Sequence, residues 1–261
     1  MKKEDKICLN KSKDFTKCIR NELVLENKKT QNKILGLLEY RMNKNKRHPD
    51  SIYEGYDENK KQYYGESTTS KYFKIIYKID PFDKKEFGSS DTIFNCWSYL
   101  LIFAKARKKM LLDNSDLKME KYIYENMDKI FKGYEDFKEL FEKLSDYHHS
   151  LANFMPAPIG FNGSFNHDGK GNFLKDNDFP DIYYKRAKDD FKEKYDWINE
   201  HMEQLSLDFF KEYKSFFENK RANTIDLTNE KQKENFKKSI ENAITSIEKR
   251  AKQLFEKCNN F

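Results

Sequence analysis

The sequence lacks the long apolar run that a membrane span needs. Its longest apolar stretch lies around Tyr99 to Ala104, which is far short of the roughly 20 residues that cross a bilayer. The first residues, Met1 to Lys6, are charged and contain no apolar signal region. We therefore expect a cytoplasmic protein that has no membrane partner.

Cysteine, proline and glycine are also scarce, with four Cys, five Pro and nine Gly in 261 residues. The cysteines lie far apart and form no CxxC pair, so the sequence predicts neither a disulfide framework nor a cysteine zinc site. Phosphate-binding glycine loops, nucleophile elbows and kinase motifs are absent, which disfavours the common cofactor enzymes. We expect a reduced compartment, no cofactor and no metal.

Charge and aromatic residues are abundant instead. Lys and Arg number 50 against 44 Asp and Glu, which leaves a net charge of only +6. That small balance is a weak indication of a nucleic-acid partner, because most of the charge should lie on a solvated surface. The 22 Phe and 16 Tyr supply the large buried areas that the 37% apolar fraction would otherwise lack. These numbers describe a folded chain rather than a disordered one.

Apolar residues recur at helical spacing along most of the sequence, which predicts a mainly α, bundle-like domain. We expect residues 1–224 to form the main helical domain, and residues 228–258 to form a C-terminal helix. That helix either docks on the main domain or mediates association, including a possible homodimer. The spacing predicts helices over residues 11–44, 93–104, 114–133, 137–151 and 181–216, the last broken near Ser206.

Capping residues mark the start of two of these helices. Ser89, Ser90 and Asp91 offer side-chain oxygens ahead of the stripe that begins at Ile93. Thr228 stands in the same relation to the C-terminal helix. We expect both helices to begin at these caps.

Two segments do not follow the helical pattern. Residues 72–79 alternate apolar and polar side chains, which predicts a small β element near residues 71–80 with no evident partner strand. Residues 152–180 lose all periodicity and contain most of the remaining Gly and Pro. We expect this segment to be a long ordered loop, and a loop of that length in a helical domain is often functional.

Two histidines stand where an apolar helix runs into this loop. Because adjacent helical positions point about 100° apart, one of His148 and His149 can face the core and the other the loop. A histidine near a helix C-terminus is often only a partner for free carbonyl groups. If the loop is catalytic, we expect His149 to act as acid or base, with Asn153, Asp178 and Arg186 positioning the substrate.

Two other patterns are weaker. Arg41 and His48 fit the spacing of HEPN-type ribonucleases, but chance alone produces such a match often, and Pro49 disfavours a helix at His48. An EF-hand aligned on Gly169 would place its twelfth ligand on Lys175, where a bidentate carboxylate is required. The sequence therefore predicts no calcium loop of this type.

A basic cluster follows the Trp97 helix and consists of Lys105, Arg107, Lys108 and Lys109. Cations at a helix C-terminus suit the helix dipole, which is a purely structural explanation. The same residues could hold the phosphate backbone of a nucleic acid. We treat the four as the candidate nucleic-acid-binding residues.

The segment from His149 to Asn162, HSLANFMPAPIGFN, resembles the GNFMPxPxxFN-like segment of a family of bacterial proteins grouped as a domain of unknown function. In that family a helix starting with Asp and aromatic residues follows a variable loop, as residues 178–184 do here. The stretch Ser90 to Trp97 is similar to the family's upstream helix start. Here Ala152 replaces a Gly and Gly163-Ser164 replaces a basic residue. The resemblance implies a bacterial, intracellular protein and assigns no functional residue.

Together these features favour a bacterial or phage-type accessory protein, of the kind found in defence systems, that binds a protein or a nucleic acid. The alternative is a small metal-independent hydrolase or ribonuclease with its site in the 148–162 loop. The sequence leaves the class of partner open.

Overall fold

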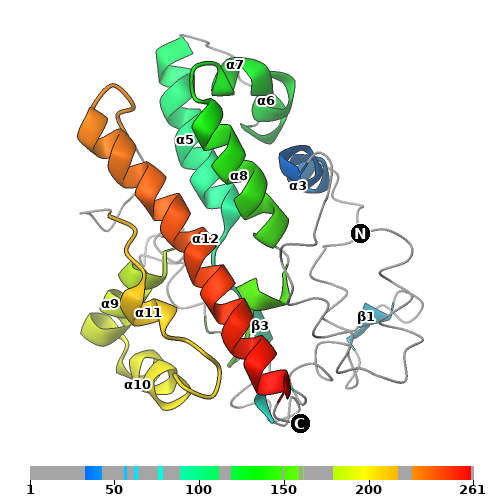
Figure 1. Ribbon diagram of the computed structural model, residues 1–261, viewed down its shortest axis with the longest axis vertical. Coiled ribbons are helices and arrows are strands. Elements are labelled where there is room, and N and C mark those ends of the chain that lie inside the picture. The colour runs from blue at the N-terminus through cyan, green and yellow to red at the C-terminus, as the bar shows by residue number, and fades with distance from the viewer. Residues whose placement is uncertain are drawn as a thin grey trace.

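The computed structural model of the chain describes residues 33–42, 56–57, 62–63, 76–78, 89–111, 119–148, 150–158, 161, 179–216 and 225–259. These residues are mainly helical, as predicted (Figure 1). The helices are α3 (Lys33–Met42), α5 (Cys96–Leu111), α6 (Met119–Glu125), α7 (Met127–Phe131), α8 (Glu135–His148), α9 (Pro180–Asp190), α10 (Lys192–Glu200), α11 (Phe209–Glu212) and α12 (Glu230–Asn259), with a 3-10 turn η3 (Leu151–Asn153). Within these ranges, no helix combines the length and the apolar character that crossing a membrane requires.

The core is centred on α5, α8 and α12. Helix α12 runs diagonally across the molecule and packs on α8 and η3, and α8 also packs on α5 (Figure 1). Phe103 of α5 lies at the centre and is fully buried. Its ring centroid lies 5.0 to 6.5 Å from those of Phe131, Phe137, Phe141 and Phe236. This aromatic cluster joins four helices, α5, α7, α8 and α12, and it uses several of the abundant Phe residues.

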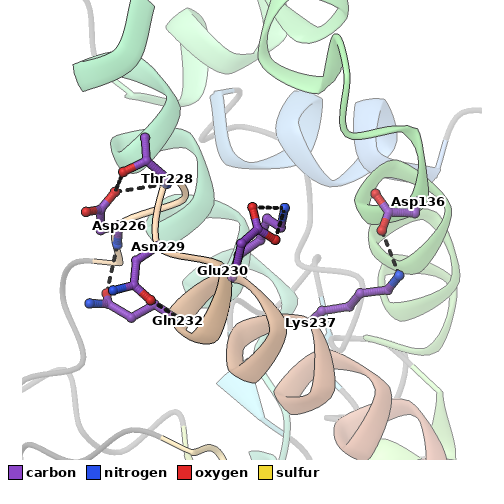
Figure 2. Close-up of polar contacts among 8 residues, drawn as sticks. Asp136, Asp226, Thr228, Asn229, Glu230, Gln232 and Lys237 are labelled. Atoms are coloured by element: carbon purple, nitrogen blue, oxygen red, sulfur yellow. Dashed lines mark hydrogen bonds and ion pairs between the residues drawn. The ribbon is translucent and has the colours of Figure 1, made fainter.

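Helix α12 buries the apolar seam that its sequence spacing indicates. The buried side chains are Phe236, Ile240, Ala243, Ile247, Ala251 and Leu254. At the start of the helix, Lys237 Nζ lies 2.7 Å from Asp136 Oδ2 in the first turn of α8 (Figure 2). The helix is thus docked on the chain's own core, and association through it stays a prediction.

The N-cap of α12 lies one residue later than predicted. Asn229 Oδ1 accepts the N–H of Gln232 at 3.1 Å, so Asn229 is the cap (Figure 2). The Thr228 hydroxyl instead donates to Asp226 Oδ1 at 2.6 Å. Gln232 Oε1 also accepts the N–H of Asp226. Because the Thr228 hydroxyl is bonded to Asp226, Thr228 does not cap the helix, and Asn229 is the N-cap.

The predicted caps ahead of α5 form a strand. Strand β3 (Ser89–Thr92) pairs antiparallel with β4 (Phe154–Ala157), with Ser89 opposite Ala157 and Thr92 opposite Phe154. Helix α5 begins only at Cys96, where Asn95 Oδ1 accepts the N–H of Trp97 at 3.1 Å. The assignment of residues 89–91 as caps was therefore wrong. A second ribbon joins β1 (Tyr56–Asp57) to β2 (Gln62–Tyr63).

The strand predicted near residues 71–80 is wrong at residues 76–78, the part of it that is described. Ile76 and Tyr77 are helical, and Lys78 has φ of +54°. Successive side chains of a strand point to opposite faces. Here Ile76 and Tyr77 are both buried, so tertiary packing overrides the alternating pattern.

The remaining helical predictions are confirmed in the described residues, with added breaks. Of the segment 11–44 the structure describes α3, and residues 11–32 and 43–44 lie outside the described residues. The segment 119–133 forms α6 and α7, interrupted at Asn126, and ends at Gly133, where φ is +75°. The segment 181–216 is interrupted at Phe191, between α9 and α10, and over residues 201–208, which include the predicted break near Ser206. Its last residues, 213–216, were predicted as helix but are not helical. Residues 152–158 were predicted to be part of the long loop. Residues 152–153 instead belong to η3, and residues 154–157 form β4. Residues 162–178 lie outside the described residues.

Candidate functional site

Asn153, a predicted catalytic residue, lies at the junction of β3, α5 and α8 and is fully buried. Its Oδ1 accepts the N–H of Phe94 at 2.8 Å. Its Nδ2 donates to the carbonyls of Phe94 and His148, at 2.9 Å each. The Asn153 amide thus acts as a backbone mimic that ties the entry of α5 to the end of α8. This geometry gives Asn153 a structural role and leaves it no direct access to a substrate.

His148 is the histidine that faces the core. It is buried, and its Nδ1 lies 3.3 Å from the carbonyl oxygen of Phe94 and 3.4 Å from the backbone nitrogen of Cys96. One tautomer donates to the Phe94 carbonyl, and the other accepts from the Cys96 N–H. His149, the predicted acid or base, lies outside the described residues, as does Asp178. Their catalytic roles stay predictions.

The fourth predicted catalytic residue, Arg186, lies on α9. Its Nε is 3.9 Å from Asp190 Oδ2, and its guanidinium carbon is 5.9 Å from the ring centroid of Phe191. These contacts belong to the hairpin formed by α9 and α10. These contacts hold Arg186 on its own hairpin, and they do not bring it to Asn153, with which it was predicted to act.

Arg107, predicted to bind nucleic acid, points into the protein. It is buried, its Nε donates to the Ile130 carbonyl at 2.8 Å, and one terminal nitrogen donates to the Lys129 and Lys132 carbonyls at 3.2 Å. Its guanidinium carbon also lies 4.5 Å from the Tyr134 ring centroid. The side chain satisfies carbonyl groups at the end of α7 that have no helical partner. Arg107 thus fixes α5 against α7.

The three lysines of the cluster share a sector of α5 that does not include Arg107. At about 100° per residue, Lys105, Lys108 and Lys109 fall within about 100° of one another, whereas Arg107 is about 160° from Lys105 and Lys109 and about 100° from Lys108. Lys109 is exposed, and the ammonium of Lys108 lies 5.1 Å from the Tyr122 ring centroid. We call these three residues the lysine face.

Lys109 also approaches the turn before α12. The pKa of Asp226 is lowered by hydrogen bonds from Thr228 first, and the positive charge of Lys109 adds to the effect. The lysine face therefore extends from the outer turns of α5 towards the start of α12. In Figure 1 the end of α5 and the start of α12 both lie in the upper part of the view.

A second cation site lies on the hairpin of α9 and α10. The ammonium of Lys194 donates a hydrogen bond to the Phe161 carbonyl. It lies 5.9 Å from the Phe161 ring centroid and 6.0 Å from that of Phe191. Burial beside these rings lowers the pKa of Lys194 to about 8. No local sequence pattern indicates this arrangement, because Phe161 and Lys194 are 33 residues apart.

Arg250 of α12 is a fully buried arginine that the sequence patterns did not single out. Its guanidinium donates hydrogen bonds of 2.6 to 3.3 Å to five acceptors. These are the backbone carbonyls of Ala152, Phe154, Leu205 and Ser206 and the hydroxyl of Tyr77. Burial lowers the pKa of Arg250 and raises that of Tyr77, an effect that the Arg250 charge partly offsets for Tyr77. The residue fastens four separate segments to one another.

Among the described residues, no group of three or more His, Cys, Asp or Glu is arranged to hold a metal ion. Comparison of the chain with protein-family models, curated proteins and solved structures gave no match. The function is therefore inferred from the side chains themselves.

Proposed function

We propose that this protein acts by binding a macromolecule, and that the macromolecule is a nucleic acid whose phosphates contact the lysine face. The observation that carries the proposal is the division of the basic cluster into one buried arginine and three lysines that share a sector of the same helix. Arg107 is buried and bonded to the end of α7, whereas Lys109 is exposed and Lys105 and Lys108 are half-buried. A rigid helix that presents several ammonium groups together suits a chain of phosphates.

The helix dipole accounts for cations at the end of α5, but it does not require three of them on one side. Lysine ammonium groups act as point charges that bind phosphate without base readout. We therefore expect binding that depends strongly on salt and weakly on base sequence. The bacterial or phage-type defence setting is part of this proposal.

The alternative of a hydrolase or ribonuclease in the 148–162 loop is less well supported. Asn153 would have to give up three hydrogen bonds to the backbone before it could position a substrate. Leaving buried backbone groups without partners costs about 1 to 3 kcal/mol each. We therefore favour binding over catalysis at this loop.

The test is a binding titration of the purified protein, stripped of nucleic acid, with mixed RNA and DNA oligonucleotides at several salt concentrations. The triple variant Lys105→Glu, Lys108→Glu and Lys109→Glu should bind at least about tenfold more weakly, with a salt slope smaller by about three. A matched triple variant places the same charge changes elsewhere, on the exposed residues Lys188, Lys192 and Lys214. It should bind like the wild type.

Circular dichroism melting of both triple variants checks that the fold is kept. Equal loss of affinity in the two variants would indicate a general charge effect and would remove the lysine face as the site. If the wild type binds no oligonucleotide even at low salt, the nucleic-acid proposal is wrong. The search would then turn to a protein partner.

A further inference from the structure

The end of α7 lies against the last turns of α5 in the upper part of Figure 1, and Arg107 joins the two. Its side chain donates to the carbonyl of Ile130 at 2.8 Å and to those of Lys129 and Lys132 at 3.2 Å. These bonds place the backbone of two lysines within hydrogen-bond distance of an α5 side chain. Lys129 and Lys132 are both exposed. The basic end of α5 therefore has two cationic neighbours that lie 22 and 25 residues further along the chain.

An exposed methionine connects the lysine face with the end of α7. Met110 is 40% exposed and directly follows Lys109, which is also exposed. At about 100° per residue, Met110 is about 100° from Lys109 and about 60° from Arg107, so it lies between them around the axis of α5. Its sulfur is 3.9 Å from a terminal nitrogen of Arg107, the side chain that is bonded to the end of α7. Exposed side chains thus lead from the lysine face around α5 to the end of α7.

The charge at the end of α7 suits an anion. The last carbonyls of a helix carry partial negative charge, which would repel phosphate. Here Arg107 bonds to three of these carbonyls and brings a full positive charge to them. Among the ion pairs of the described residues, none involves Lys129 or Lys132. Glu135, the acid that begins α8, instead accepts the N–H of Gly133 at 3.0 Å. Both ammonium groups are therefore available to a bound phosphate.

We propose that the bound nucleic acid crosses the C-terminal end of α5, and that Lys129 and Lys132 bind its phosphates together with the lysine face. The crossing rests on the proposed function, and it extends the binding surface from one helix to two. A helix with its side chains is about 10 to 12 Å across, whereas the phosphates of one duplex strand are spaced by about 3.4 Å along the axis. A ligand that reaches both sides of α5 must therefore carry several linked phosphates. This selects a polynucleotide over a mononucleotide or free phosphate.

The experiment titrates the full-length protein with an oligonucleotide of about 20 nucleotides at several salt concentrations. The double variant Lys129→Gln and Lys132→Gln should bind about fivefold more weakly than the wild type. Its salt slope should be smaller by about two, because two phosphate contacts are lost. The matched control, Lys188→Gln and Lys192→Gln, removes the same charge from exposed positions of α9 and α10 and should bind like the wild type.

Failure of the crossing can be told apart from failure of the proposed function. A wild type that binds no oligonucleotide even at low salt would refute the proposed function, and the crossing with it. If the lysine-face variant loses affinity but the double variant at Lys129 and Lys132 binds like its control, the lysine face is kept and the crossing is wrong. Both positions are exposed, so thermal melting should place the Tm of the double variant within about 2 °C of the wild type.

The number of oligonucleotides bound per protein tests whether one strand contacts both sides of α5. At low salt and saturating ligand we expect one oligonucleotide per protein. A variant with Gln at Lys129, Lys132 and all three positions of the lysine face should have a salt slope smaller by about five, because the contacts belong to one ligand. Two oligonucleotides per protein, each lost with one set of substitutions, would show that the lysine face and the end of α7 are separate sites. That result would overturn the crossing.

Discussion

Two regions of the molecule remove a cation from water, Arg250 completely and Lys194 in part. At the junction of α12 with η3 and β4, the guanidinium of Arg250 is enclosed by four backbone carbonyls and the hydroxyl of Tyr77. On the α9 and α10 hairpin, the ammonium of Lys194 meets a carbonyl and the faces of two rings. Around Arg250, carbonyl and hydroxyl oxygens replace the water molecules that would solvate the charge. Around Lys194, aromatic rings take up much of that space.

The difference decides what each cation can do. Burial lowers the pKa of both side chains. An arginine stays charged in spite of this because its ordinary pKa is above about 12, so Arg250 can only be a structural donor. Lys194 reaches a pKa of about 8, where the neutral form becomes populated near physiological pH. The same physical effect therefore accompanies a permanently charged anchor in one region and a group that titrates near physiological pH in the other.

The two regions also differ in the distance along the chain that they span. Arg250 is 173 residues from Tyr77 and 96 from Phe154, two of its partners. Lys194 is 33 residues from Phe161. Disruption of the Arg250 junction should therefore affect global stability, whereas changes at Lys194 should be felt locally.

The largest expected effect is that of Arg250→Met. The variant keeps most of the side-chain volume but leaves four buried carbonyls and the Tyr77 hydroxyl without their donor. We expect a loss of about 3 to 5 kcal/mol in the free energy of unfolding. That loss corresponds to a fall of about 10 °C in Tm. Urea denaturation and thermal melting both measure it.

The matched control is Lys252→Met, which makes the same kind of change at an exposed position of α12. It should alter stability by no more than about 0.5 kcal/mol. If Arg250→Met is as mild as the control, the junction does not depend on its cation and the comparison between the two regions fails.

A smaller loss is expected for Asn153→Ala at the same junction. The substitution removes one acceptor and two donors that pair with the backbone of Phe94 and His148. We expect about 2 to 3 kcal/mol of destabilisation, seen as a Tm lower by several degrees. Asn235→Ala, at a half-buried position on α12, should cost little. An unchanged Tm together with lost function would restore the catalytic hypothesis for Asn153.

The helices could be predicted from the sequence wherever one face is clearly apolar. Helices α5, α8 and α12 have long stripes of buried side chains, and their positions follow from the 3.6-residue period. The element at residues 76–78 could not be predicted in this way. In this element the Tyr77 hydroxyl accepts a hydrogen bond from Arg250, and no local sequence pattern indicates such a distant contact. The same holds for β3, whose partner strand lies more than 60 residues later.

The candidate sites were only partly predictable, because charged residues are assigned to the surface by default. Arg107 and Arg250 are both buried, and each falls within the apolar stripe of its helix. Arg250 lies three residues after Ile247 and four before Leu254, both of which are buried. Such a position is a usable signal for a buried cation. The position in the stripe does not indicate which distant carbonyls will accept hydrogen bonds from the cation and so offset the free-energy cost of burying it.

The smallest effect concerns the other region and takes the form of a pH dependence. In the folded chain the pKa of Lys194 is about 8, whereas in the unfolded chain it returns to about 10.4. Between these values the unfolded chain binds one proton more than the folded chain, so folding becomes more favourable as pH rises. Below about pH 8 both forms bind the proton, and the cost of burying the charge is fully present.

The measurement is the difference in unfolding free energy between the wild type and Lys194→Met at several pH values from about 7 to 10. The variant does not titrate at this position, so the groups common to both proteins cancel. The wild type should gain on the variant by about 1 kcal/mol, less than the full pKa difference implies, because the half-buried side chain is partly screened by solvent. A difference that stays flat would mean that Lys194 is hydrated like a surface lysine. The pKa of Lys194 would then give no basis for the comparison between the two regions.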